Sequence, residues 1–119
     1  MIKRDDVLWM AGYLEGEGSF HYVRASKAQR GKACPQPRPL YPVIGVVSID
    51  KDVIERVCRL TGAAMTGPYT RPSKPLVKPI YRSTVTGPNA RGWMMMIYPF
   101  MGQRRKAKIK SVLTQWREQ

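Results

Sequence analysis

The sequence predicts an α+β domain in which an antiparallel four-stranded sheet packs against helices. The predicted elements follow one another as helix, two strands, helix, two strands and two helices, and runs of strands set before helices indicate this class. The chain has 119 residues, of which 43% are hydrophobic. This is the size of one domain and is too apolar for a disordered basic tail. We therefore expect residues 1–119 to form a single domain.

The first helix is expected to begin at an aspartate cap and to end at a glycine. Asp5 or Asp6 can supply the cap. Apolar positions then have helical spacing through 7–16, and Gly18 stops the helix. The next segment, Ser19–Ala25, alternates between two faces and predicts a strand.

A loop, a second strand and a second helix follow. Residues 26–42 hold several prolines and basic residues, which predicts a loop. The run Tyr41–Ile49 is rich in Val and Ile and predicts a more fully buried strand. Asp50 or Asp52 can then cap a helix that Gly62 stops.

The last part of the chain predicts two short strands and two helices. The strands are expected near Gly67–Arg71 and at Ile80–Thr86. In the second of these strands, alternate residues share a face: Tyr81, Ser83 and Val85 on one, and Arg82, Thr84 and Thr86 on the other. Asn89 is expected to cap a helix that reaches about Met101, and a last helix is expected from about Arg104.

The charge of the chain indicates a polyanionic partner. Lys and Arg number 21 against 8 Asp and Glu, which gives a net charge of +13. No acid lies between Gly18 and Ile49, and every charged residue from Arg56 to Arg117 is basic. A surface that needs only solubility mixes both signs, whereas long one-signed segments suit phosphate backbones. We therefore expect a nucleic acid rather than a small acidic molecule.

Several other classes are disfavoured by what the sequence lacks. No apolar run approaches the roughly 20 residues that cross a bilayer, and the first residues lack a secretory signal. We therefore expect no membrane partner and a cytoplasmic location in a bacterial, phage or organellar setting. Cys34, Cys58 and His21 are too few for a structural zinc site, and reduced intracellular thiols are the simpler interpretation.

The first helix is unusual because it contains paired glycines and ends in two acids. Gly12 and Gly16 each cost about 1 kcal/mol of helix propensity relative to Ala. Their spacing places them on one face, where another helix can approach closely. Glu15 and Glu17 lie at the C-terminal end, which disfavours negative charge. Acids there indicate a cation site, and the alternative is that both are solvated and pair with nearby arginines.

The stretch Trp9–Phe20, WMAGYLEGEGSF, resembles the motif that names the LAGLIDADG homing endonucleases. Residues 10–18 match the motif position by position, with both acids kept as Glu in place of Asp. The segment Ser48–Val53 resembles the family's second strand as it enters a helix. The segment Tyr98–Arg105 resembles its late Pro-Phe-Leu turn followed by basic residues. The resemblance covers essentially the whole chain and implies the family's αββαββα core.

This resemblance implies a metal site at the end of the first helix. In the family, the last acid of the motif binds divalent metals at the scissile phosphates, which assigns this role to Glu17. The carbonyl just before that acid often helps, which points to Gly16. The implied chemistry is metal-assisted phosphodiester hydrolysis with Mg²⁺ or another divalent cation as the cofactor.

Two further catalytic positions are implied by register. The family's polar residue at the end of the second strand falls at Asp50, and the alternative is that Asp50 only caps the next helix. The basic residue that organises water near the phosphate falls at Arg104. If the register slips, Arg105 or Lys106 takes this place.

The chain contains one copy of the motif, so the resemblance implies a homodimer with two-fold symmetry. Gly12 and Gly16 would lie at the dimer interface, and the target would be pseudo-palindromic double-stranded DNA. The polar face of the sheet and the basic loops are expected to contact this DNA. The expected contacts are His21, Lys27, Arg30, Lys32 and Arg38 from the first hairpin and Arg71, Arg82 and Thr84 from the second.

The expected function is therefore site-specific cleavage of double-stranded DNA, and two alternatives stay open. One is a LAGLIDADG-like nucleic-acid-binding protein that does not cut, such as a maturase or a transcription factor. Retention of Glu15 and Glu17 argues against it, because a pure binder gains nothing from acids that face phosphate. The other is a structural or ribosome-associated basic domain, but this class does not explain why two glycines occur on one face of a helix.

Overall fold

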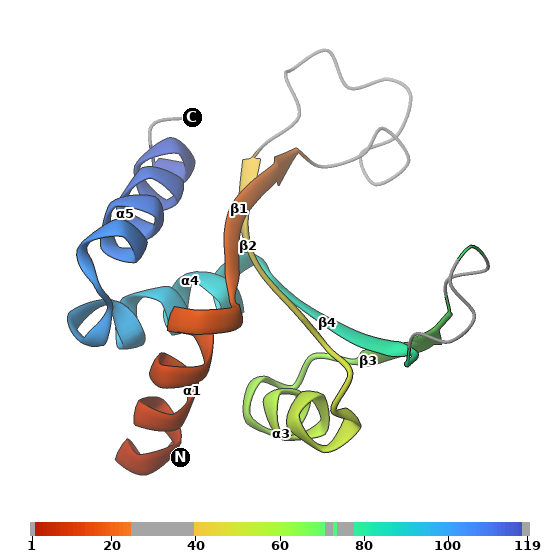
Figure 1. Ribbon diagram of the computed structural model, residues 1–119. Helices are drawn as coiled ribbons and strands as arrows, with labels where there is room; N and C mark the ends of the chain where they lie inside the picture. Colours follow the sequence, from red (N-terminus) through yellow and green to blue (C-terminus); the bar gives the residue numbers. More distant parts are fainter. Residues whose placement is uncertain (1, 25–39, 71–72, 74–77, 118–119) are drawn as a thin grey trace.

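The computed structural model describes residues 2–24, 40–70, 73 and 78–117, and this part of the chain has an α+β fold (Figure 1). The elements are α1 (Arg4–Glu17), β1 (Ser19–Arg24), β2 (Leu40–Ser48), α3 (Lys51–Thr61), β3 (Met65–Tyr69), β4 (Ile80–Thr86), α4 (Gly87–Ile97), the 3-10 helix η1 (Tyr98–Phe100) and α5 (Gln103–Arg117). The strands form one antiparallel sheet in the order β1-β2-β4-β3. The predicted fold class and element order are confirmed.

One face of the sheet carries the hydrophobic core. Phe20, Ile44 and Val85 are partners across β1, β2 and β4, and each is at most 2% exposed. Side chains from α1, α3, α4 and α5 join them in one cluster, and Figure 1 shows α1, α4 and α5 along one side of the strands. Residues of the opposite parity, such as Arg82 and Thr84, are exposed. The sheet therefore has a helix-covered face and an open face.

The start of α1 differs from the prediction. The helix begins one residue before Asp5, and Lys3 takes the cap position without a side-chain hydrogen bond. Asp5 and Asp6 lie in the first turn instead, where negative charge interacts favourably with the helix dipole. Gly18 does end the helix: its N–H bonds the Leu14 carbonyl at 3.0 Å, and an added Cβ would lie 2.8 Å from that oxygen.

The strand β3 and the helix α4 also begin earlier than predicted. β3 starts at Met65 rather than Gly67, because Met65 pairs with Ser83 and packs against the core. Asn89 does not cap α4; Thr86 takes the cap position. The Asn89 side chain instead donates a hydrogen bond to the Thr61 carbonyl at the end of α3, at 2.7 Å. Tertiary contacts outweigh the local signals at both points.

The predicted helix up to about Met101 is in fact shorter. α4 ends at Ile97, and the η1 turn that contains Pro99 leads into α5. This turn brings Gly102 and the start of α5 to the end of α1, where the candidate site lies. None of the helices in the described ranges is long and apolar enough to cross a membrane.

Candidate functional site

The two glutamates at the end of α1 have different surroundings. Glu15 is partly buried, and its Oε2 accepts a hydrogen bond from the Gly102 N–H at 3.2 Å. Glu17 is exposed, and its carboxylate forms no hydrogen bond or ion pair with any residue that the structure describes. Residues two apart in a helix differ by about 200° around its axis. Glu15 is therefore tied to the η1–α5 connection, whereas Glu17 is available to a ligand.

Arg105 binds the backbone on both sides of Glu17. Its Nε donates to the Glu15 carbonyl at 3.1 Å, and its Nη1 donates to the Gly18 carbonyl at 2.6 Å. Carbonyls at a helix C-terminus lack intrahelical donors and carry partial negative charge, so a guanidinium is a favourable partner. These carbonyls use two of the five N–H donors of the Arg105 guanidinium, and the shifted register that would place Arg105 beside a phosphate stays a prediction.

Two surface hollows meet at Glu17. One, of about 560 Å³, lies between α1, the end of β2 and the start of α3, and Asp50 lines it. The other, of about 360 Å³, lies on the open face of the sheet and is lined in part by His21, Arg82 and Thr84. The structure thus brings Glu17 together with Asp50 on one side and with three of the expected DNA contacts on the other.

Asp50 occupies the cap position of α3 without capping it through its side chain. No hydrogen bond joins the Asp50 carboxylate to the start of the helix; the Asp50 backbone carbonyl accepts the bonds from Val53 and Ile54 instead. The Asp50 N–H donates to Ser48 Oγ at 3.0 Å, which fixes the turn between β2 and α3. The exposed carboxylate is therefore free to face the hollow that it shares with Glu17.

Tyr13 lies in the same hollow, and the sequence interpretation did not single it out. Its hydroxyl oxygen is buried and has no hydrogen-bond partner in the described part of the chain. Burial, and then the negative charges of Glu17 and Asp50, raise the pKa of this hydroxyl, so it stays neutral at physiological pH. A motif position that the sequence presents as apolar thus places a polar atom near both carboxylates.

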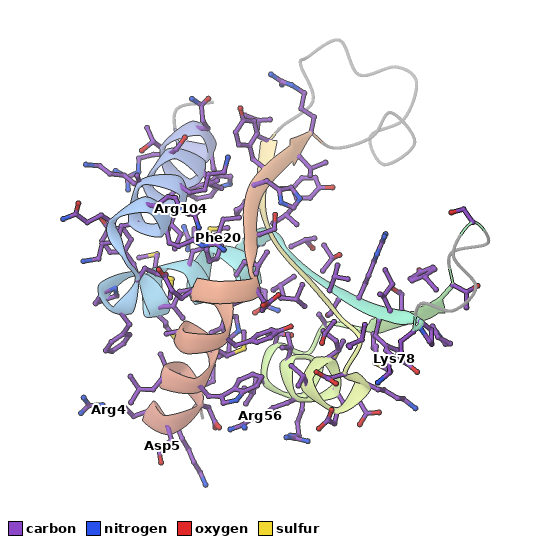
Figure 2. All side chains as sticks on the ribbon, in the orientation of Figure 1. Arg4, Asp5, Phe20, Arg56, Lys78 and Arg104 are labelled. Atoms are coloured by element: carbon purple, nitrogen blue, oxygen red, sulfur yellow. The ribbon has the colours of Figure 1, made fainter. Side chains whose placement is uncertain are left out.

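An aromatic stack forms the wall of this hollow. The rings of Trp9 and Tyr13 stack with their centres 5.4 Å apart. The Arg56 guanidinium lies 4.2 Å from the centre of the Trp9 ring, and Figure 2 shows Arg56 between α3 and α1. Stacking and cation–π contacts of this kind restrict ring orientation. The orientations of the Trp9 and Tyr13 rings on the α1–α3 side of the hollow are therefore restricted.

Arg104 lies apart from these hollows. It is exposed in the first turn of α5 and lines a third hollow, of about 470 Å³, together with Lys108 and the start of β1. Figure 2 shows Arg104 in the region where α5 passes Phe20 of β1. Within one chain Arg104 lines neither hollow that contains Glu17. Its role near the scissile phosphate stays a prediction.

The open face of the sheet has the predicted side-chain parity. Arg82 and Thr84 are exposed on it, whereas Ser83 between them is 2% exposed. The Arg82 guanidinium lies 5.1 Å from the centre of the Tyr69 ring on β3, which orients it over the face. His21 contributes from β1. The other expected contacts lie outside the described residues: Lys27, Arg30, Lys32, Arg38 and Arg71.

The paired glycines of α1 have no close neighbour among the residues that the structure describes. Gly12 and Gly16 are both exposed, and nothing beyond the helix backbone lies within 4 Å of a Cβ placed at either position. Leu8, one turn before Gly12, is 39% exposed. Positions 8, 12 and 16 share one side of the helix, so α1 presents an uncovered stripe of small and apolar residues.

The oxygen donors at the end of α1 fit a divalent cation that keeps other ligands. Mg²⁺ is commonly held by one or two carboxylates together with substrate phosphates and water. No group of three or more His, Cys, Asp or Glu able to hold a metal occurs among the described residues. Among the described residues, the hollow at this helix end holds the carboxylates of Glu17 and Asp50, which leaves coordination positions for water and substrate phosphates.

Comparison with solved structures identifies the fold. The homing endonuclease I-CvuI, in complex with its target, aligns with a TM-score of 0.66 at 15% identity over 94% of this chain and 68% of that one. The group I intron-encoded homing endonuclease I-CeuI, complexed with DNA, gives 0.60 at 13% identity over 96% and 55%. The LAGLIDADG homing endonuclease I-LtrWI, bound to target DNA, gives 0.62 at 18% identity over 100% and 39%.

These alignments confirm the resemblance seen in the sequence: the chain has the fold of LAGLIDADG homing endonucleases. No protein-family model matches the sequence. No curated protein matches it either.

Proposed function

We propose that this protein is a site-specific endonuclease that hydrolyses double-stranded DNA with a divalent metal ion. The observation that carries the proposal is the position of Glu17. It is a carboxylate without a partner among the described residues, at the junction of an acidic hollow and an open, polar sheet face. In a chain of net charge +13, a free acid on the expected DNA-facing side opposes binding unless it holds a cation.

In this proposal the residues of the chain divide the work. Glu17 and the Gly16 carbonyl would hold Mg²⁺, and Asp50 faces the same hollow as Glu17. The metal would activate the attacking water and stabilise charge on the leaving oxygen. A guanidinium is a poor proton donor and acceptor, so the expected part of Arg104 is to stabilise phosphate charge rather than to move a proton.

A second copy of the chain is part of the proposal. The stripe that contains Gly12 and Gly16 is exposed, and no described residue packs on the two glycines, although each glycine weakens the helix. The two glycines would allow a second α1 to approach closely, and this packing would bring two Glu17 residues near the two-fold axis. A pseudo-palindromic target follows from that symmetry.

The open face of the sheet is the proposed DNA-reading surface. Side chains on strands can reach base edges in the major groove, whereas loop cations mostly contact phosphates. Arg82, Thr84 and His21, which line one hollow on this face, would serve the first task. The basic residues expected in the loops would serve the second.

Selection from a random duplex library, with and without Mg²⁺, tests the proposal. We expect one family of related sites to be cut, only when Mg²⁺ is present, and these sites to have two-fold symmetry. Sites that are retained on the protein but never cut, with any divalent metal, would support the non-cleaving binder instead. The same binding selection in EDTA shows which duplexes are recognised independently of cutting.

A further inference from the structure

Three hydrogen bonds between α1 and the η1–α5 connection surround the residues that are proposed to hold the metal. Glu15 and Gly18 flank Gly16 and Glu17, and the carbonyls of both flanking residues accept bonds from Arg105, at 3.1 and 2.6 Å. The third bond joins Glu15 Oε2 to the Gly102 N–H at 3.2 Å. Glu15, Gly102 and Arg105 line neither of the two hollows that contain Glu17.

We propose that Arg105 and Glu15 are positioning residues that fix Gly16 and Glu17 in the geometry that binds the metal, an inference that rests on the proposed function. They act through the backbone of α1, not on DNA. Glu15 and Arg105 are far apart in sequence, so the hydrogen bond from Arg105 to the Glu15 carbonyl joins the motif helix α1 to the basic helix α5.

The end of α1 needs such a support. Gly16 and Gly18 flank Glu17 and leave the backbone more freedom than other residues would. Helix ends fray, and the dipole at this end disfavours the two acids that it carries. A guanidinium bound to the last carbonyls offsets that charge and restrains the backbone on both sides of Glu17.

The chemistry of the support requires arginine. The planar guanidinium presents several N–H groups in a fixed fork and can serve two carbonyls at once, whereas a lysine ammonium is a single flexible point charge. Arg105 also lies over the Phe20 ring, 5.8 Å from its centre. Gly102 completes the support, because a Cβ there would lie 2.7 Å from Glu15 Oε1 and displace the carboxylate that bonds its N–H.

The substitution Arg105→Lys tests the inference because it keeps the charge and removes the fork. The protein is bound to a duplex from the binding selection whose central linkages are phosphorothioates. Mn²⁺ is then titrated into this complex, and the electron paramagnetic resonance signal of free Mn²⁺ measures how much of the metal is bound. We expect Mn²⁺ to bind about tenfold more weakly, the usual cost of losing a group that orients a metal ligand. DNA affinity in EDTA should stay within about twofold, because the charge of the chain is unchanged.

A second variant and a control complete the experiment. Glu15→Ala removes the Gly102 bond, leaves the helix backbone able to accept from Arg105, and should weaken Mn²⁺ binding several-fold. Lys110 is exposed on α5, the helix that carries Arg105. Lys110→Ala removes a charge from that helix and should leave Mn²⁺ affinity unchanged. Thermal unfolding of each variant reports whether it folds. If Arg105→Lys does not fold, the Mn²⁺ affinity of Glu15→Ala tests the inference.

The outcomes separate this inference from the proposed function. If the wild-type complex binds no Mn²⁺, the metal-dependent nuclease is wrong and this inference with it. If the wild type binds Mn²⁺ and the folded variants bind it equally well, Arg105 and Glu15 only join two helices and the inference alone is overturned.

Discussion

The helix-covered face and the open face of the sheet differ in what their residues contact, and the end of α1 repeats that difference on a smaller scale. On the covered side, Ile44 and Val85 are buried, and Arg105 and Gly102 bind the end of α1. On the open side, Arg82 is exposed and Glu17 has no described partner. One side fixes the structure, and the other leaves charged groups available to a ligand, which is the arrangement a precise site requires.

The largest expected effect is that of Glu17→Gln on the open side. The amide keeps the size of the side chain but cannot hold a divalent cation as a carboxylate does, so cleavage should fall by orders of magnitude. DNA binding should survive or tighten, because a negative charge that faces phosphate is removed. Single-turnover cleavage and a binding titration in EDTA measure the two effects. Full cleavage by this variant would show that the motif register is wrong.

Gly12→Leu should separate two copies of the chain without unfolding either. The glycine is exposed and no described residue lies near an added Cβ, so leucine fits the monomer, but it would hold a second α1 away. We expect sedimentation to show a monomer, and cleavage to be lost with the dimer. Gly92→Leu on α4 is the matched control, because Gly92 is also helical and open. A Gly12→Leu protein that still dimerises would place the interface elsewhere.

The two faces of β2 should differ in their effect on stability. Ile44 is fully buried on the covered face, and truncation to alanine should lower the free energy of unfolding by about 2–5 kcal/mol. Val47 on the open face is 44% exposed, and the same truncation should cost about 1 kcal/mol or less. Urea unfolding of both variants checks this pair. Equal losses would mean that something covers the open face in solution.

Arg82→Ala should weaken DNA binding on the open face. An arginine that reads a base edge contributes about 1–3 kcal/mol of discrimination, so affinity for the selected site should fall roughly tenfold. Arg59→Ala, an exposed arginine in the last turn of α3, removes the same charge elsewhere. Titrations at two salt concentrations separate the roles, because a pure phosphate contact lowers the salt slope and weakens all sequences alike. A loss that is the same on random DNA would assign Arg82 to phosphate.

The sequence alone was enough for the features that depend on local pattern. Strand alternation separated Arg82 and Thr84 from Ser83, and their polarity assigned them to the open face. The paired glycines and acids identified α1 as the informative helix. These signals work because periodicity and glycine spacing are properties of neighbouring residues. The element order followed for the same reason.

The sequence was not enough for features that depend on distant partners. The bonds from Arg105 to Glu15 and Gly18 span 90 and 87 positions of the chain, and no local spacing signals them. Asn89 has the composition of a cap but bonds the end of α3, and a tyrosine in an apolar motif gave no sign that its hydroxyl would be buried beside carboxylates. Tertiary contact decides each of these cases.

The smallest expected effect is that of Glu15→Gln, which tests the covered side of the α1 end. The amide oxygen can still accept the Gly102 N–H, and the Arg105 bonds to the backbone carbonyls are untouched, so only the charge of one hydrogen bond changes. A hydrogen bond to a charged group exceeds a neutral one by about 1 kcal/mol, so cleavage should fall only a few-fold. The same single-turnover assay measures it beside Glu17→Gln. If Glu15→Gln abolishes cleavage while Glu17→Gln spares it, the two acids have exchanged roles and the division between the sides of α1 is wrong; if neither affects cleavage, metal binding at this helix end is wrong.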